Sequence, residues 1–347
     1  MAYTTINKST DYFNTKLYTG NGSSQSITGV GFTQDFTWIK IRSEVNHNRL
    51  MDTVRGATKE LYSDLTSAEV TGANGLTSFD SDGFSLGTDN AFNKSSATYA
   101  SWNWKANGTG SANTDGTINS TVSANTTAGF SIVSFTGNST SGATVGHGLG
   151  AVPKMIILKL LSGSDNWTIY HSSLGNTKRL ELNNANAPST SATAGWNNTS
   201  PTTSVFSLGN NGQVNGSGQT YIAYCFAEKT GYSKFGSYTG NGSTDGTFVY
   251  TGFKPAFIMI KKSNAGDGWF MYDNKREGYN QQNNHVMAHS NAAETTGGSV
   301  AYIDILSNGF KCRSTNGNMN ASGDSYITMC FAEAPLVGTN NVPCTAR

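Results

Sequence analysis

The feature that most constrains this chain is a strand-like segment that occurs three times with its aromatic residues in register. Each copy starts with Thr or Ser followed by Tyr, and large apolar residues then alternate with smaller ones. The copies are Thr98-Tyr99-Ala100-Ser101-Trp102-Asn103-Trp104, Thr220-Tyr221-Ile222-Ala223-Tyr224-Cys225-Phe226 and Ser325-Tyr326-Ile327-Thr328-Met329-Cys330-Phe331. They are separated by roughly 120 and then roughly 105 residues, a period too long for a solenoid repeat, which indicates tandem domains.

Three further markers keep their order within each repeat. A Gly-Asn turn opens the repeat, an apolar run containing Lys follows, and a strand with Phe precedes the recurring segment. The turns begin at Gly20, Gly137 and Gly240; the runs are 36–42, 153–159 and 255–261; the Phe strands are 83–87, 205–209 and 309–312. The second and third repeats add Asp-x-Trp-x-x-Tyr at 165–170 and 267–272, and the first repeat lacks it. Because Trp167 and Trp269 are equivalent, a packing role is favoured for both.

These markers divide the chain into three domains at 1–106, 129–228 and 231–333. Residues 107–128 are rich in Gly, Ser, Thr and Asn and contain only Ile118 and Val122 as bulky apolar residues. That composition predicts a flexible linker. The second junction is only two residues long, so the second and third domains are expected to hold a fixed relation. Residues 334–347 form a C-terminal tail.

All the strong apolar segments have the character of β-strands. They are short, rich in β-branched and aromatic residues, and bounded by Gly, Asn and Asp. No window keeps a period of 3.6 over three turns, so long helices are not expected. The recurring segment is apolar on both faces, which suits a central strand. The chain is therefore predicted to be all-β, with three tandem antiparallel β-sandwich domains.

Composition and charge exclude some functions. Lys and Arg total 23 against 22 Asp and Glu, so the net charge is +1 and the basic excess of a nucleic-acid-binding protein is missing. No stretch approaches the ~18 apolar residues of a membrane span. The first eight residues lack the apolar core of a secretion signal, so we expect synthesis in a cytoplasm without membrane insertion.

Metal and nucleotide chemistry were sought in two motifs. His285 and His289 are four residues apart, but the pair lacks the Glu of H-E-x-x-H and lies in a strand-like context, where its members would be ~13 Å apart. Residues 146–154 (GHGLGAVPK) are similar to a phosphate loop, but a Pro and a strand follow where a helix is needed. No metal and no cofactor are predicted. A Ca²⁺ site at acidic turns such as Asp80-Ser81-Asp82-Gly83 stays open as an alternative to a turn-forming role.

No catalytic constellation emerges from the sequence. The five histidines are at non-equivalent positions, and neither a nucleophile elbow nor an acid pair facing across a cleft is indicated. The chain is predicted not to be an enzyme. Trp196 lies in a polar loop with no counterpart in the other repeats, which makes it the best single candidate for contact with a glycan or a partner. Packing beneath its own loop is the alternative.

The four cysteines are Cys225, Cys312, Cys330 and Cys344. Cys225 and Cys330 are at equivalent positions of different repeats, so they are not expected to pair. Buried thiols are the expectation, and a Cys312–Cys330 bridge stays open.

The motifs together resemble a domain of virion proteins of marine tailed bacteriophages. The resemblance is carried by Tyr18-Thr19-Gly20-Asn21-Gly22, Trp38-Ile39-Lys40-x-Arg42, Asp52-Thr53-Val54-Arg55-Gly56 and His147-Gly148-Leu149-Gly150-x-x-Pro153. The third repeat departs from it, with no His in its turn and no clear equivalent of Arg55. The resemblance implies a lectin-like jelly-roll sandwich of the kind found in virion proteins called tail-fibre-like, and it brings no catalytic residues with it.

From these observations we expect a non-enzymatic structural protein on the exterior of a phage particle, assembled in the host cytoplasm. It would be a head decoration or a tail-associated fibre component, with other virion proteins as partners and a homo-oligomeric, possibly trimeric, state. The alternative function is an adhesin that binds host surface glycans.

Overall fold

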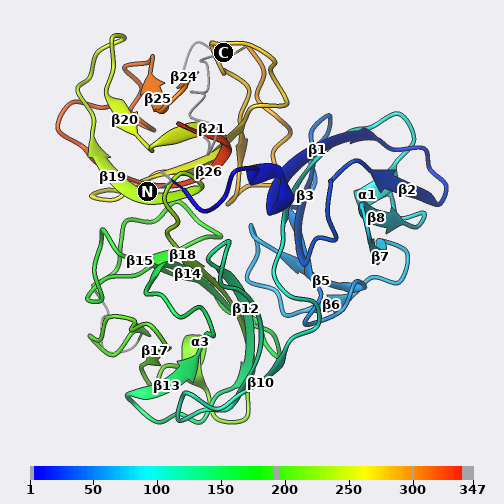
Figure 1. The fold of residues 1–347 in the computed structure, drawn as a ribbon, viewed down its shortest axis with the longest axis vertical. Helices are drawn as coiled ribbons and strands as arrows, with labels where there is room; N and C mark the ends of the chain where they lie inside the picture. The colour runs from blue at the N-terminus through cyan, green and yellow to red at the C-terminus, as the bar shows by residue number, and fades with distance from the viewer. Residues whose placement is uncertain (1–3, 191–194, 298–300, 338–347) are drawn as a thin grey trace.

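Three lobes surround a common centre (Figure 1). The computed structural model describes residues 4–190, 195–297 and 301–337. We refer to residues 4–106 as the first lobe, 107–228 as the second and 231–337 as the third. The helical elements η1 (Ser9–Asp11), α1 (Asn90–Asn93) and α3 (Gly212–Asn215) are each one short turn, and the strands are paired almost entirely antiparallel. The prediction of an all-β chain built of sandwiches is confirmed.

Each lobe has a large sheet backed by a small one. In the first lobe the large sheet has the order β1 (Phe13–Thr19), β9 (Thr98–Trp104), β3 (Phe36–Ile41), β4 (Arg49–Asp52), β5 (Lys59–Tyr62), β6 (Val70–Thr71), and the small sheet the order β2 (Gln25–Thr28), β8 (Gly83–Leu86), β7 (Leu76–Asp80).

The other two lobes repeat this plan. In the second, the large sheet is β10 (Ser111–Asn113), β11 (Ser120–Asn125), β12 (Phe130–Thr136), β18 (Thr220–Ala227), β14 (Pro153–Leu160), β15 (Thr168–His171), β16 (Leu180–Glu181), and the small sheet is β13 (Ala143–Gly146), β17 (Val205–Leu208). In the third, the large sheet is β19 (Ser233–Thr239), β26 (Ser325–Pro335), β21 (Phe253–Lys262), β22 (Trp269–Asp273), β23 (Val286–Met287), and the small sheet is β20 (Phe248–Tyr250), β25 (Gly309–Cys312), β24 (Ile303–Leu306).

Residues 107–128 are part of the second lobe, so the predicted linker is wrong. β10 and β11 lie within them, and β11 pairs with β12 over its whole length. Ile118 and Val122 are 6% and 7% exposed, so the two bulky apolar residues of the segment are the ones that anchor it. The predicted tail begins inside β26, which continues to Pro335. Residues 338–347, including Cys344, lie outside the described residues.

The recurring segment forms an interior strand of each large sheet, which we call the central strand, as its two apolar faces predicted. β9 lies between β1 and β3, β18 between β12 and β14, and β26 between β19 and β21. Its two faces enter different cores because successive side chains of a strand point to opposite sides. On β18, Tyr221, Ala223 and Cys225 pack within the lobe. Ile222, Tyr224 and Phe226 instead enter a core shared by all three lobes.

The shared core makes the three lobes one body. Trp104, Phe226 and Phe331 occupy equivalent positions on the three central strands and are each 1% exposed. The Phe331 ring lies 5.6 Å from Trp104 and 5.9 Å from Phe226, measured between centroids. Aromatic rings are the largest apolar groups a core can bury, so the faces that meet here are strongly stabilised by each other. The predicted division into tandem domains therefore describes three lobes, each of which completes the core of the other two.

The tyrosine at the start of each recurring segment binds the turn that precedes the strand. Each hydroxyl donates to the carbonyl nine residues earlier and accepts the N–H five residues earlier. For Tyr99 the partners are Asn90 at 2.9 Å and Lys94 at 2.8 Å, and for Tyr326 they are Gly317 at 2.7 Å and Ala321 at 2.9 Å. Tyr221 repeats the pattern with Gly212 and Gly216. The hydroxyl thus fixes the short turn that precedes the strand.

A buried asparagine holds each opening Gly-Asn turn in place. The carboxamide oxygens of Asn93, Asn215 and Asn320 accept the N–H groups of Asn21, Asn138 and Asn241 over 2.9, 2.9 and 3.1 Å. All three clamping asparagines are completely buried. A buried amide must be hydrogen bonded to be tolerated, so this contact specifies the turn.

Candidate functional site

The junctions between lobes contain a set of buried polar contacts that recurs from lobe to lobe. Each junction contains a lysine at the end of the apolar run seen in the sequence. Lys40 donates to the carbonyl oxygen of Asn291 at 3.0 Å, Lys159 to that of Thr66 at 3.0 Å, and Lys261 to that of Asn186 at 3.1 Å. The first lobe thereby contacts the third, the second contacts the first, and the third contacts the second, which closes a ring.

These three lysines have an unusual environment. All are completely buried, and each ammonium also donates to a carbonyl of its own lobe, from Asn46, Asp165 and Asp267. Burial lowers the pKa of each to about 8, against an ordinary value of 10.5. A lysine with such a pKa is a usable nucleophile when a substrate reaches it. Here carbonyl oxygens surround the ammonium and nothing of the side chain is exposed, so the arrangement serves to join lobes.

The strand position opposite each lysine makes a second contact between lobes. Trp167 donates its indole N–H to the carbonyl of Tyr62 at 2.8 Å, and Trp269 donates to Glu181 at 2.9 Å. The first lobe has Asn48 at this position. Asn48 accepts the indole N–H of Trp38 at 3.0 Å and donates to the carbonyl of Met287 at 3.1 Å. The missing tryptophan of the first repeat is thus replaced by an asparagine backed by a different tryptophan.

A third set of contacts contains buried ion pairs. Arg55 donates to Asp52, and Tyr224 of the second lobe donates to the same carboxylate at 2.7 Å. In the third lobe Arg276 donates to Asp273 at 2.6 Å. The expectation that the third repeat has no equivalent of Arg55 is therefore wrong. The spacing Asp-x-x-Arg is visible in both repeats, but the second repeat obscures it because His171 stands at the aspartate position.

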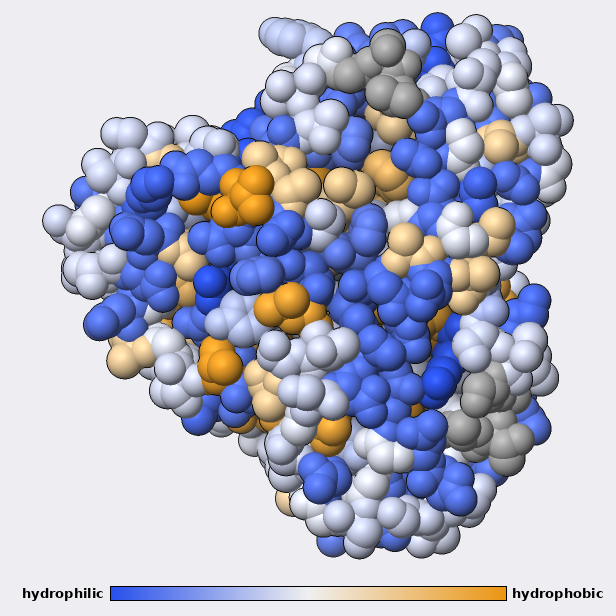
Figure 2. Space-filling model, turned by 180° about the vertical axis from the view of Figure 1, so that it is seen from behind, coloured by the Kyte–Doolittle hydropathy of each residue, from blue (hydrophilic) through white to orange (hydrophobic). Residues whose placement is uncertain are grey.

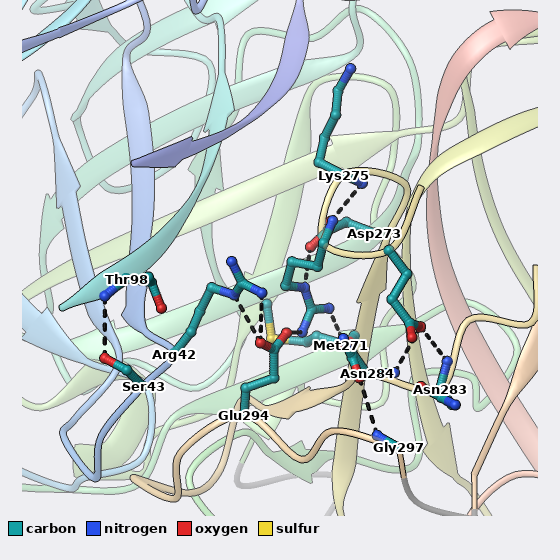
Figure 3. Close-up of polar contacts among 12 residues, drawn as sticks. Arg42, Ser43, Thr98, Met271, Asp273, Lys275, Asn283, Asn284, Glu294 and Gly297 are labelled. Carbon is teal, nitrogen blue, oxygen red and sulfur yellow. Dashed lines mark hydrogen bonds and ion pairs between the residues drawn. The ribbon is translucent and has the colours of Figure 1, made fainter. Parts of the chain in front are cut away.

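Arg276 belongs to a network that connects the third lobe to the first, and Figure 3 labels Arg42, Asp273 and Glu294 of this network. Glu294 accepts from Arg276 at 2.9 Å through one oxygen and from Nε of Arg42, in the first lobe, at 2.9 Å through the other. Asp273 also accepts the indole N–H of Trp102 at 3.1 Å. Burial alone would lower the pKa of Arg276, but the carboxylates of Asp273 and Glu294 raise it, so the guanidinium stays charged. Both carboxylates are compensated, as buried charges must be.

Trp196, the predicted contact residue, is buried. It is 1% exposed and packs edge-on against Tyr170, with the ring centroids 5.8 Å apart. A glycan or partner therefore cannot touch its ring in this structure, and the prediction of a direct contact is corrected in favour of packing beneath its own loop. The polar neighbours in the sequence concealed this burial.

The His285–His289 pair and the cysteines singled out in the sequence do not form a common site, and His285 is buried whereas His289 is partly buried. The His285 ring packs at a tilt against the rings of Phe270 and Tyr272, and the Nδ1 of His289 accepts the N–H of Trp269 at 3.1 Å. Within the described part of the chain no cluster of three or more His, Cys, Asp or Glu side chains could hold a metal ion. Cys225, Cys312 and Cys330 are free and buried, so the Cys312–Cys330 bridge is not formed.

The glycine-rich loop at 146–154 and the acidic turn at Asp80–Gly83 have structural roles in connecting strands. Residues 147–152 connect β13 to β14, and the His147 ring accepts the N–H of Leu149 at 3.2 Å. Asp82 accepts the N–H groups of Gly29 at 2.9 Å and Gly31 at 2.7 Å, which is a turn-stabilising role. No helix in the described ranges is both long and apolar enough to cross a membrane.

The surface offers open, polar depressions. One of them lies between the first and third lobes and is lined by Asn14, Thr15, Lys16, Leu17, Gly29 and Lys275. It contains two lysines and no carboxylate, so it lacks the acid–base pair on which hydrolysis of glycosides depends.

In a comparison with protein families, residues 8–335 match a family described as a domain of unknown function, DUF7483. The chain belongs to the DUF7483 family. The matched range runs from before β1 to the end of β26 and so contains every strand and every contact described above. No curated protein and no solved structure matches this DUF7483 chain.

Proposed function

We propose that this chain is a non-enzymatic structural protein of the exterior of a bacteriophage particle, either a head decoration or a tail-associated component. The observation that carries the proposal is the closed ring of lobes around one core. The buried lysines Lys40, Lys159 and Lys261 and the Asp52–Arg55 and Asp273–Arg276 pairs make contacts that join the lobes, which is an arrangement for maintaining shape. The sequence resemblance to virion proteins of marine tailed phages supports the same role.

The surface agrees with this proposal. In Figure 2 the hydrophilic face is interrupted by scattered hydrophobic residues. Charged residues are only 13% of the chain, so hydroxyl and amide groups provide most of the polar surface. A particle protein of this composition attaches through surface shape and uncharged groups, and its contacts should respond weakly to salt. Other virion proteins are the partners that this role requires.

The glycan-binding alternative was suggested by Trp196, and it is no longer supported by this residue because Trp196 is buried. We therefore propose one function. It carries no enzymatic step, and incubation with host polysaccharide should leave the viscosity of the polysaccharide unchanged.

The direct experiment is quantitative mass spectrometry of purified particles of the phage that encodes the chain. A head decoration should be present in on the order of hundreds of copies and a tail component in about a dozen or two, because these locations differ in symmetry. The major capsid protein is the internal standard. Absence of the chain from particles that are otherwise complete would reject the proposal.

A further inference from the structure

The outer face of the small sheet differs between the lobes. Ile27, Val145 and Val249 are equivalent, because each pairs with a buried Phe of the next strand. The residues on either side of them lie on the opposite, outer face of each small sheet. The first lobe has Ser26 and Thr28 there and the second has Thr144 and Gly146, whereas the third has Phe248 and Tyr250. These two aromatic side chains are 44% and 53% exposed.

The backbone of β20 is also open along one side. β20 pairs with β25, and no described residue pairs with its other edge. The N–H of Thr251 donates to Asn308, and the carbonyl of Thr247 accepts from Cys312, so these residues are directed toward β25. Alternation along an antiparallel strand then directs the N–H and C=O groups of Phe248 and Tyr250 to the open edge. An apolar edge strand without protection is a site for pairing with another strand.

In the second lobe the equivalent edge, that of β13, is covered. There the carbonyl of Thr144, the equivalent of Phe248, accepts the N–H of Ile118 at 2.9 Å. The N–H of Thr144 donates to the hydroxyl of Thr117 at 2.8 Å. The second lobe therefore satisfies its edge with its own leading segment. The third lobe follows the second through a two-residue junction, and among the residues that the structure describes no comparable segment pairs with β20.

We propose that β20 is a self-association site, where β20 of a second copy of this chain pairs antiparallel with it. A two-fold axis beside Val249 places Phe248 of each copy opposite Tyr250 of the other. The outward backbone groups are at these two residues, so each opposed pair exchanges two hydrogen bonds. The opposed aromatic side chains add a cross-strand contact.

A second copy is favoured over a partner of different chemistry because the edge is complementary to itself. The charged side chains near β20 are already paired: Lys311 with Asp245, and Arg313 with Asp304 at 3.1 Å. Two copies can therefore meet here without local charge repulsion, and the net charge of +1 adds little long-range repulsion between them. Two-fold pairing of identical surfaces is the commonest form of self-association. The inference concerns the isolated chain and is independent of the proposed role in a particle.

Sedimentation velocity of the full chain from about 1 to about 200 μM tests the proposal, over the range expected for a small interface. We expect concentration-dependent dimerisation. The variant F248S/Y250T, which gives β20 the residues of the first lobe, should raise the dimer dissociation constant at least about tenfold. Tyr250→Pro keeps Phe248 and should also raise the dimer dissociation constant. Proline removes the N–H of residue 250, which is directed to the open edge, and leaves the hydrogen bonds to β25 in place.

Tyr279→Ser is the matched control. Tyr279 is 83% exposed in the same lobe, next to Asn280, which binds β24 on the opposite side of the small sheet. Its dimerisation should equal that of the unchanged chain. A chain that stays monomeric throughout, or a dimer insensitive to both β20 variants, would overturn the proposal. Binding on a glycan array that F248S/Y250T abolishes, without dimerisation, would assign the patch to sugars instead. Circular dichroism checks that each variant is folded.

Discussion

Arg276 occupies in the third lobe the place that Arg55 occupies in the first. Each guanidinium donates through Nε to the aspartate three residues earlier, over 2.6 Å to Asp273 and 2.5 Å to Asp52. Each aspartate in turn accepts from an aromatic side chain on the central strand of another lobe. The pair therefore does more than close a turn within its lobe, because it also fixes the neighbouring lobe.

Replacing Arg276 by Met should destabilise the whole chain. Asp273 and Glu294 would remain buried without their counter-charge, and breaking a buried pair in this way costs about 3–5 kcal/mol. Urea denaturation followed by tryptophan fluorescence measures the loss. Lys8→Met is the control, because the Lys8 side chain is 70% exposed in its ion pair with Asp11, and it should change stability by less than about 0.5 kcal/mol. Equal effects of the two variants would contradict the network.

The junction between the second and third lobes should weaken in acid. The Nε2 of His171 lies 3.2 Å from the Thr328 carbonyl, and its Nδ1 accepts the N–H of Ser173, which requires a neutral ring. Burial lowers the pKa of His171 from 6.5 to about 4. Between these pH values the unfolded chain binds a proton that the folded chain does not, so stability is full above pH 6.5 and falls as the pH drops toward 4, by on the order of 3 kcal/mol.

Urea denaturation at about pH 7 and about pH 4.5 tests this dependence. His171→Asn should start less stable and lose less between the two pH values than the unchanged chain. The other histidines with lowered pKa, including His285 at about 4, contribute in the same direction in both proteins. An identical loss with and without His171 would remove it as the acid-sensitive contact.

The indole of Trp269 should contribute a measurable hydrogen bond between lobes. Trp269→Phe removes the N–H that binds the Glu181 carbonyl, and an unpaired buried carbonyl costs about 1–3 kcal/mol. Trp196→Phe is matched in volume, but the buried Trp196 N–H has no hydrogen-bond partner among the described residues. Trp269→Phe should therefore lower the urea midpoint more than Trp196→Phe does. The reverse order would contradict the contact.

The three buried thiols should resist labelling in the folded chain. Burial raises the pKa of Cys312 to about 11 and that of Cys330 to about 12, and it raises that of Cys225 as well, so little thiolate forms near neutral pH. Iodoacetamide treatment followed by peptide mapping should find these cysteines modified only after denaturation. Modification of any of them at the rate of a free thiol would show that its core opens.

The repeats made the central strands predictable, because Tyr99, Tyr221 and Tyr326 could be aligned without a structure. The alignment also showed that these strands are apolar on both faces. It did not show what each face contacts, since a face that packs on another lobe has the same composition as one that packs within its own. The shared core was therefore not predicted.

The errors have local causes. Residues 107–128 have the composition of a linker although they contain β10 and β11. Two buried apolar residues, Ile118 and Val122, are enough to anchor these strands at the end of the sheet, so the rest of the segment can be polar. Trp196 was misjudged because its neighbours in sequence are polar and its contact, Tyr170, is distant along the chain. The lysines at the lobe junctions were visible as the basic ends of apolar runs, but only the structure brings a second lobe to them.

Differential scanning calorimetry of the full chain tests the central claim, which is that three lobes form one cooperative structure around a shared core. We predict a single transition whose calorimetric enthalpy equals its van't Hoff enthalpy. Phe331→Ala, at the centre of the shared core, should move this transition to lower temperature as a whole. Two or three separate transitions, or a calorimetric enthalpy about three times the van't Hoff value, would show that the lobes fold independently and would contradict the account.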